Sequence, residues 1–282
     1  MRFPPISYFV TLEAYRRGGS GLKVCVLATS SSGNCTFVGT GSTRILIDAG
    51  LSAKETVQRL KAIGERIEDI TAILVTHEHS DHVCGLPVLL KKLGVPVFVS
   101  ELTATQIDWT EAESTRRGPA RVCTFAAGSA FSVGDFRVQS FSVPHDAVDA
   151  CGFTVAGASI KIGLAMDLGY VPENVRYHLD GCELVVLESN HDLEMLKVGP
   201  YPWSLKQRVM GRRGHLSNDA AADYLLESFD ARVGTLVLGH LSEQNNHPEI
   251  VRLVAQSAIA RRAMRTRLTV VEPRKQSEVF SF

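Results

Sequence analysis

His77-Glu78-His79-Ser80-Asp81-His82 is the stretch of this chain that decides its fold. It follows residues 73–76 (Ile-Leu-Val-Thr), a short apolar run that is typical of a buried strand. Three imidazoles and a carboxylate within six residues supply the nitrogen and oxygen ligands that zinc, manganese and iron accept. The first two histidines are two positions apart and project to the same side of an extended segment, whereas the aspartate and the last histidine lie where the chain has to turn. The stretch therefore predicts one tight turn that serves two adjacent metal ions.

The motif H-x-H-x-D-H after an apolar strand resembles the signature of the metallo-β-lactamase-fold hydrolases. The resemblance runs from about Lys23 to the C-terminus. Three further stretches are similar to the YycJ/WalJ-type branch of that superfamily, namely residues 30–35 (SSSGNC), 188–192 (ESNHD) and 239–246 (GHLSEQNN). The resemblance implies an α/β fold, the αββα four-layer sandwich, with a site for two divalent metal ions between the sheets. These ions are expected to be zinc or manganese, with iron as a further option.

The composition is that of an ordinary soluble globular protein, with 45% hydrophobic and 21% charged residues among 282. Lysine plus arginine and aspartate plus glutamate both number 30, so the formal net charge is zero. Global charge therefore gives no support to nucleic-acid binding, and any basic surface must be local. No apolar run reaches the roughly 18 residues that a membrane helix needs, so we expect no membrane partner. The sequence makes no prediction of the oligomeric state.

The chain is expected to contain one domain preceded by an arm. Residues 1–21 hold two prolines and the stretch Arg16-Arg17-Gly18-Gly19, with no uninterrupted apolar block, so they do not resemble a signal peptide. We expect a poorly ordered N-terminal arm over residues 1–21 and a single hydrolase domain over residues 22–282. The six cysteines are scattered and include no C-x-x-C pair, which favours free thiols and a cytoplasmic location.

Strand and helix patterns alternate along the chain, which predicts a layered α/β architecture. Residues 52–55 form a capping box and begin a helix, residues 86–93 form another, and residues 103–121 are expected to be helical. Residues 71–77 and 234–240 share an apolar strand that ends in histidine. This internal similarity places His240 on the opposite half of the same site.

The resemblance implies a ligand set for each ion. It assigns His77, His79 and His145 to the first ion, Asp81, His82 and His240 to the second, and Asp167 as the bridging carboxylate. Considered alone, His145 and His240 would more often be ordinary polar residues, and Asp167 could be a turn former before Gly169. The histidine cluster in the same chain favours the ligand roles instead.

Further residues are candidates for catalysis. Glu188 is expected to form a hydrogen bond with a ligand histidine and to fix its tautomer. His191 and His215 are candidates for contacting a phosphate or protonating a leaving group, and surface or structural roles remain the alternative. Asp81 or Asp167 is expected to hold an attacking metal-bridging hydroxide in line. Asp48 follows a strand and is expected near the metal loop, where it could orient a histidine.

Two stretches are candidates for binding the substrate. The Ser-rich turn that contains Ser32 and Asn34 exposes hydroxyl and backbone N–H groups and can hold an anion, or it can be a plain polar hairpin turn. Arg212 and Arg213, together with Lys206 and Arg208, form a basic stretch before His215 that could hold a phosphate backbone. A solvated basic helix is the alternative.

The resemblance implies a phosphodiesterase that acts on DNA, with 5′-to-3′ exonuclease-like action as its specific form. Asp167 occupies the place where many β-lactam-cleaving relatives carry cysteine, which argues against a β-lactamase. A thioesterase or lactonase with the same ions is the second hypothesis, and a non-catalytic metal-binding regulatory protein is the third. Turnover of a generic phosphodiester compared with that of a thioester separates the first two hypotheses, and absence of both activities with metal loaded indicates the third.

Overall fold

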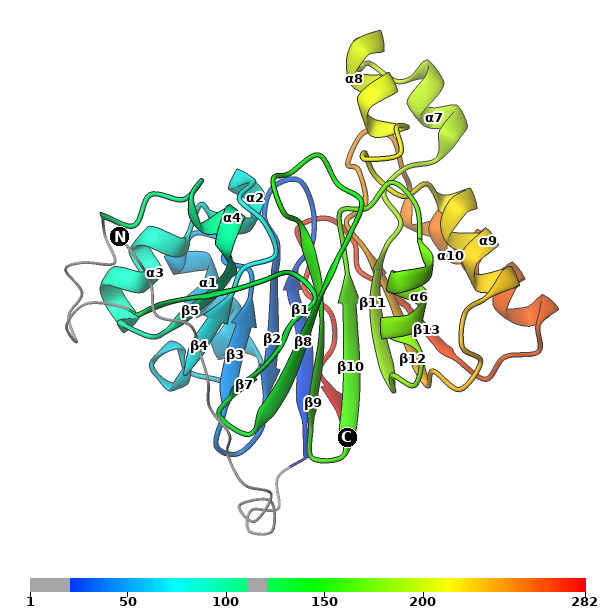
Figure 1. Cartoon of the computed structure of the whole chain (residues 1–282). Coiled ribbons are helices and arrows are strands. Elements are labelled where there is room, and N and C mark those ends of the chain that lie inside the picture. The colour runs from blue at the N-terminus through cyan, green and yellow to red at the C-terminus, as the bar shows by residue number, and fades with distance from the viewer. Residues whose placement is uncertain (1–20, 111–120) are drawn as a thin grey trace.

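The computed structural model describes residues 21–110 and 121–282. The arm expected over residues 1–21 lies outside this range, except for Gly21. Two mixed β-sheets pack face to face, and helices cover both outer faces (Figure 1). The predicted αββα sandwich is therefore confirmed.

Both sheets contain seven strands within the described ranges. The spatial order in the first sheet is β14 (Phe280–Ser281), β1 (Lys23–Ala28), β2 (Cys35–Gly39), β3 (Arg44–Ile47), β4 (Ala72–Leu74), β5 (Val97–Ser100) and β6 (Val122–Phe125). The order in the second sheet is β13 (Arg267–Val270), β12 (Thr235–Gly239), β11 (Leu184–Glu188), β10 (Ile160–Ala165), β9 (Cys151–Gly157), β8 (Phe136–Ser142) and β7 (Ala130–Val133). Pairing is parallel from β3 to β6 and from β10 to β13, and antiparallel elsewhere.

The helices follow the strands in sequence and divide between the two outer faces. The first half of the chain contributes α1 (Ala53–Ala62), the 3-10 helix η2 (Ile67–Asp69), α2 (Ser80–Val83), α3 (Leu86–Leu93) and α4 (Glu101–Ala104). The second half contributes α6 (Glu173–Leu179), α7 (Leu193–Val198), α8 (Trp203–Val209), α9 (Asn218–Glu227) and α10 (Pro248–Arg261). Ser52 begins α1 as the capping box predicts, because its side chain accepts a hydrogen bond from the backbone N–H of Glu55.

The period-2 geometry of a strand explains why the sequence shows near-continuous apolar runs. In β1, Val24 and Val26 face the core between the two sheets, whereas Cys25 and Leu27 face the core beneath the helices. Strand β11 alternates in the same way between the inter-sheet core and the core under α6, α9 and α10. Both faces of each of these strands are buried, so neither needs polar residues.

The helix expected over residues 103–121 is interrupted in the part of it that the structure describes. Thr103, Ala104 and Thr110 are helical. Helix α4 ends at Ala104, and residues 105–109 are not helical. The side chain of Asp108 accepts hydrogen bonds from the backbone N–H and hydroxyl of Thr110, where the chain is helical again, as a residue at a helix N-terminus does. Residues 111–120 lie outside the described part of the chain.

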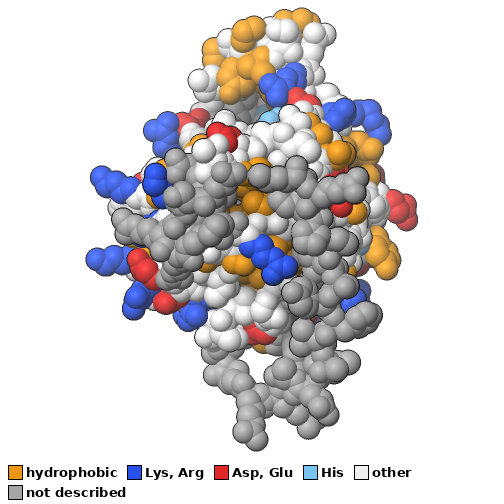
Figure 2. Space-filling view, turned by 60° about the vertical axis from the view of Figure 1, so that its left-hand side comes forward, with side chains coloured by type: hydrophobic (Ala, Val, Ile, Leu, Met, Phe, Trp, Pro, Cys, Tyr) orange, Lys and Arg blue, Asp and Glu red, His pale blue; other side chains and the backbone are white. Residues whose placement is uncertain are grey.

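Helices α7 and α8 project beyond the sheets at the end of the molecule where α2 lies (Figure 1). Figure 2 shows hydrophobic side chains on this projecting part and a histidine exposed beneath it. Val198 and Trp203 are 85% and 62% exposed there. No helix in the described ranges has the length and hydrophobicity needed to cross a bilayer.

Candidate metal centre

The candidate metal centre lies where strands from both sheets end. Strand β4 leads into the loop that carries the histidine cluster, β10 leads into Asp167, and β12 leads into His240. Asp48, Asp167 and His240 have left-handed backbone conformations, with φ of 64°, 54° and 57°. Such conformations cost about 1 kcal/mol or more for a residue with a side chain, so they persist only where the surroundings enforce them. The chain therefore bends sharply at three strand ends to turn these side chains into one site.

The first group of candidate ligands joins the loop to the opposite sheet. His77, His79 and His145 each offer a ring nitrogen, and these nitrogens all lie within 4.8 Å of one another. Nε2 of His77 is buried and has no hydrogen-bond partner among the described residues. Burial lowers the pKa of His77 and of His145, so both rings stay neutral and keep the lone pair that a metal needs.

A second group consists of Asp81, His82 and His240, whose ligand atoms also lie within 4.8 Å of one another. Asp167 connects the two groups, because a carboxylate oxygen of Asp167 and ring nitrogens of His77 and His82 all lie within 4.8 Å of one another. Its Oδ1 also lies 3.3 Å from His240 Nδ1. Burial favours a raised pKa for Asp167, but the charges of His240 and His82 outweigh burial and hold its pKa well below the usual range. Asp167 is thus an anion at the middle of the cluster, as a bridging ligand must be.

Four hydrogen bonds fix the orientation of the histidine rings. His82 donates through Nδ1 to Asp48 Oδ2 at 2.8 Å, and His145 donates through Nδ1 to the carbonyl of Gly214 at 3.2 Å. Glu188 Oε1 accepts from Nδ1 of His240 at 2.8 Å and from Nδ1 of His215 at 2.7 Å. A histidine that donates from one ring nitrogen presents the other as a ligand, which is the usual arrangement around a protein-bound metal.

Glu188 is buried, and both of its carboxylate oxygens are engaged. Besides its two histidine partners, its Oε2 accepts from the backbone N–H groups of Leu168 and Leu216. Burial favours a raised pKa for Glu188, but His215 and the hydrogen bonds from both histidines lower its pKa to about 2. Glu188 is therefore a fixed negative charge that positions His215 and His240.

The residues of the centre fit divalent metal ions. The cluster offers imidazole nitrogens and carboxylate oxygens, which are the donors of zinc and manganese sites. Nε2 of His77 and Nε2 of His240 are both buried and lack hydrogen-bond partners among the described residues. In the metal-free protein, neighbouring carboxylates raise the pKa of His240 to about 10 despite its burial. A divalent ion would replace that proton as the positive charge among the carboxylates.

The chain is similar to known proteins. The chain matches the β-lactamase superfamily domain over residues 43–241, and it belongs to that superfamily. Among its relatives it is similar to Exodeoxyribonuclease YycJ of Bacillus anthracis, with 38% identity over 83% of this chain and 87% of that protein. Exodeoxyribonuclease WalJ of Streptococcus pneumoniae is 34% identical over 85% of this chain and 89% of the relative. The crystal structure of the metallo-β-lactamase-fold protein YhfI from Bacillus subtilis has the same fold, with a TM-score of 0.70 and 15% identity over 93% of this chain and all of YhfI.

Ser32 and Asn34, the two candidates for substrate binding in the serine-rich turn, lie in different surroundings. Asn34 is 5% exposed, and its Nδ2 lies 3.2 Å from Asp81 Oδ2 and 3.0 Å from His82 Nε2, so it adjoins the candidate ligands. Ser32 is exposed, and its hydroxyl donates to Glu243 Oε1 at 3.2 Å. The turn therefore contacts the candidate ligands through Asn34, while Ser32 pairs with Glu243 at the surface.

The basic stretch before His215 is largely engaged with the protein itself. Lys206 is only 8% exposed and donates to the carbonyl of Lys197, and Arg208 pairs with Asp146. Arg213 donates to the carbonyl of His145 at 2.8 Å, so it helps to hold the loop of a candidate ligand. Arg212 lies over the ring of Tyr170, 4.2 Å from the ring centre, and has no hydrogen bond to any described residue. Arg212 is thus the member of this stretch whose guanidinium donors are open to a phosphate.

Sequence reasoning missed Thr76 and Gly50. The hydroxyl of Thr76 lies 2.9 Å from Asp48 Oδ2, 3.0 Å from His77 Nδ1 and 3.1 Å from His82 Nδ1, so it links the residues beneath the cluster. A Cβ atom on Gly50 would lie 1.6 Å from the carbonyl oxygen of Asp81. The available signal for Thr76 was its position at a strand end, directly before His77. The available signal for Gly50 was its position in Asp48-Ala49-Gly50, two residues after Asp48.

Replacing Gly50 by alanine is expected to reduce metal binding at the cluster by about tenfold or more, as changes beside a ligand do. The added methyl group must displace the backbone of Asp81, which lies between His79 and His82. The measurement is metal content after dialysis against a competing chelator. Gly234→Ala is the matched control, since its Cβ would meet only the carbonyl of Glu183 at 3.4 Å, an ordinary contact. Equal metal content in both variants would contradict the prediction.

His191, a candidate for catalysis, is 1% exposed, and neither ring nitrogen has a hydrogen-bond partner among the described residues. Burial lowers its pKa to about 4. An unfolded chain protonates its histidines below about pH 6.5, so the unfolded state binds more protons between these values and stability falls as the pH is lowered through that window.

Replacing His191 by asparagine is therefore expected to reduce the pH dependence of stability. The loss of unfolding free energy in the metal-free protein between pH 7.5 and pH 5 should become smaller by roughly 2 kcal/mol. Urea unfolding at both pH values measures this difference. An unchanged difference would show that His191 is not held neutral in the folded protein.

Proposed function

We propose that the protein is a metal-dependent phosphodiesterase that degrades DNA from the 5′ end. The observation that carries the proposal is the convergence of a complete set of histidine and aspartate ligands in a chain that spans most of two relatives named exodeoxyribonucleases. We propose zinc or manganese as the ions, with iron as a further option, because mixed imidazole and carboxylate donors suit all three. The residues that would hold them are His77, His79, Asp81, His82, His145, Asp167 and His240.

When bound, the two ions would supply an activated water nucleophile and neutralise the charge that develops on the phosphate. The side chain of Asp81 is 21% exposed and its Oδ2 lies 3.5 Å from His82 Nε2, so it can accept a proton of the attacking water and hold that water in line. An Asp81→Asn variant with undiminished turnover would exclude this role.

His215 is the candidate proton donor to the leaving oxygen. Its side chain is 24% exposed, and Nδ1 is engaged by Glu188, which leaves Nε2 on the side open to a substrate. Burial favours a lowered pKa for His215, but the carboxylate of Glu188 outweighs burial and raises its pKa above the ordinary value. A histidine that is protonated near neutral pH can give its proton to an alkoxide as the phosphodiester bond breaks.

The alternative of a thioesterase or lactonase with the same ligands is not favoured, because the relatives that this chain matches over 87% and 89% of their length are named as exodeoxyribonucleases. We place the protein in the cytoplasm, where DNA is present and where its six free cysteines would stay reduced.

The test of the proposed function is hydrolysis of 5′-labelled linear double-stranded DNA, with zinc and manganese supplied separately. The expected result is metal-dependent release of nucleotides from the 5′ end. His77→Ala should abolish this release, whereas His178→Ala should retain it because His178 lies on α6 and stacks against Phe141. Hydrolysis of a thioester without any cleavage of DNA would overturn the proposal in favour of an acyl hydrolase.

A further inference from the structure

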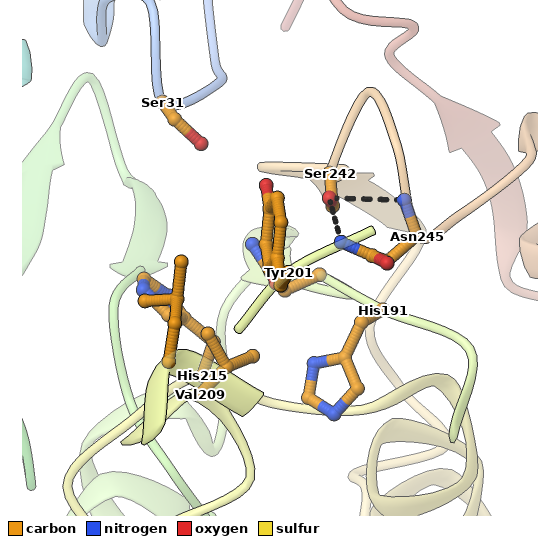
Figure 3. A pocket seen from close by; sticks show the side chains of 9 residues that line it. Ser31, His191, Tyr201, Val209, His215, Ser242 and Asn245 are labelled. Carbon is orange, nitrogen blue, oxygen red and sulfur yellow. Dashed lines mark hydrogen bonds between the residues drawn. The ribbon is translucent and has the colours of Figure 1, made fainter. Parts of the chain in front are cut away.

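A pocket of about 140 Å³ lies beside the candidate metal centre (Figure 3). Its lining includes Tyr201, which lies between α7 and α8, and Leu205 and Val209, which belong to α8. His215 also lines the pocket, and its Nδ1 lies 2.7 Å from Glu188 Oε1 and 3.4 Å from Asp167 Oδ1. One side chain thus contacts both the pocket and the cluster.

The pocket contains buried polar atoms that have no partner. Both ring nitrogens of His191 lack a hydrogen bond to any described residue, and so does Oδ1 of Asn245. These side chains are 1% and 0% exposed, and both line the pocket. Buried polar groups in folded proteins are normally paired, so unpaired ones that share a cavity indicate a ligand that completes them.

Within the part of the chain that the structure describes, the pocket has no charged lining residue apart from His215, which borders the candidate metal centre. Of the described residues that line it, none is a lysine, arginine, aspartate or glutamate. Burial lowers the pKa of His191 to about 4, so its ring is neutral at physiological pH and offers one donor and one acceptor. Phosphate groups are held by cationic side chains or by arrays of N–H donors, whereas a mixture of neutral donors and acceptors suits an uncharged polar group.

The size and walls of the pocket fit one aromatic ring. Its volume is close to that of an engineered cavity of about 150 Å³ that binds benzene. Leu205 and Val209 provide apolar walls, and Tyr201 lies among the lining side chains with its ring available for stacking (Figure 3). Nucleobases combine a flat apolar face with donors and acceptors at the edge, and proteins hold single nucleotides by stacking such faces on aromatic side chains.

We propose that this pocket receives the base of the terminal nucleotide while the adjacent phosphodiester lies at the metal centre. The inference rests on the proposed function and adds to it a subsite that recognises the nucleotide to be released. Because the pocket has room for a single base, it predicts release of nucleotides one at a time. Tyr201 stacks on the base, and His191 and Asn245 pair with its edge.

The test compares two 5′-phosphorylated oligonucleotides, one normal and one in which the 5′-terminal nucleotide lacks its base. The wild-type protein is expected to have a kcat/KM at least about tenfold higher for the normal end, which is the usual scale for the loss of one stacked base. In Tyr201→Ala, the ratio of the two kcat/KM values should fall towards one. Tyr201→Phe keeps the ring and should keep the ratio.

Tyr177→Ala is the matched control, because Tyr177 is 73% exposed on α6 and does not line the pocket. Its ratio should equal that of the wild type. Equal cleavage of both ends by the wild type would overturn the base pocket, and so would a Tyr201→Ala variant that keeps the wild-type ratio. Failure of the wild type to cleave either oligonucleotide, with metal loaded, would instead overturn the proposed function itself.

Discussion

Replacing Asp167 by asparagine is expected to lower DNA hydrolysis by about 10³-fold or more. Stabilisation of transition-state charge by bound ions is worth several kcal/mol, and each 1.36 kcal/mol corresponds to about a factor of ten in rate. Asp167 is 2% exposed and lies with His77 and His82 in one group of candidate ligands and with His240 in another. Loss of its charge therefore affects both ion positions at once.

Metal content gives the Asp167 prediction a second measurement that is independent of turnover. The wild type is expected to retain two ions per chain after dialysis, and the Asp167→Asn variant fewer than two. Asp230→Asn is the matched control, because Asp230 is an acidic residue whose partners are Arg232 and the backbone of Gly181, away from the cluster. If Asp167→Asn retained both ions and full turnover, a bridging role for Asp167 would be excluded.

The sequence predicted the fold because its signals are local and agree with one another. Most strands of the sandwich are short runs rich in apolar residues, and the alternation of strands and helices indicates a layered fold. The strands β13 (RLTV) and β14 (FS) lack such a run and were not predicted. The cluster from His77 to His82 was visible for the same reason, since one turn of chain carries all of its residues. His145, Asp167 and His240 are far from that turn in the sequence, so their approach was implied only by the resemblance and by the similar strands that precede His77 and His240.

Other features depended on tertiary contacts that no local pattern encodes. The basic stretch suggested a phosphate-binding surface, but Lys206 donates to the carbonyl oxygen of Lys197 in α7 and Arg213 donates to that of His145. Tyr201 has no motif around it, and its place beside His191 follows from the path of α7 and α8 over the site. The helix expected beyond Thr103 is interrupted after Ala104, and the hydrogen bond from the backbone N–H of Thr110 to Asp108 marks where the chain becomes helical again.

Glu188 positions two histidines of the candidate metal centre, so its replacement is expected to have a large effect. We expect Glu188→Gln to lower metal affinity by about 10- to 100-fold and to lower turnover by a similar factor, the usual effect of losing a partner of a ligand histidine. Oε1 of Glu188 accepts from Nδ1 of both His215 and His240, whereas Oε2 accepts from two backbone N–H groups. A glutamine has one oxygen and one NH₂ group, so it cannot accept all four hydrogen bonds.

The loss of the Glu188 carboxylate in Glu188→Gln should also change the pH profile of turnover. In the wild type the carboxylate of Glu188 raises the pKa of His215, so in Glu188→Gln the protonated form of His215 is expected to disappear at a lower pH. The alkaline limb of the profile should therefore move to lower pH, which a merely structural defect would not cause. Glu183→Gln is the matched control, because Glu183 precedes the other end of β11 and accepts from the backbone of Lys161. A lower turnover with an unmoved alkaline limb would mean that Glu188 orients His240 alone and that His215 is not the proton donor.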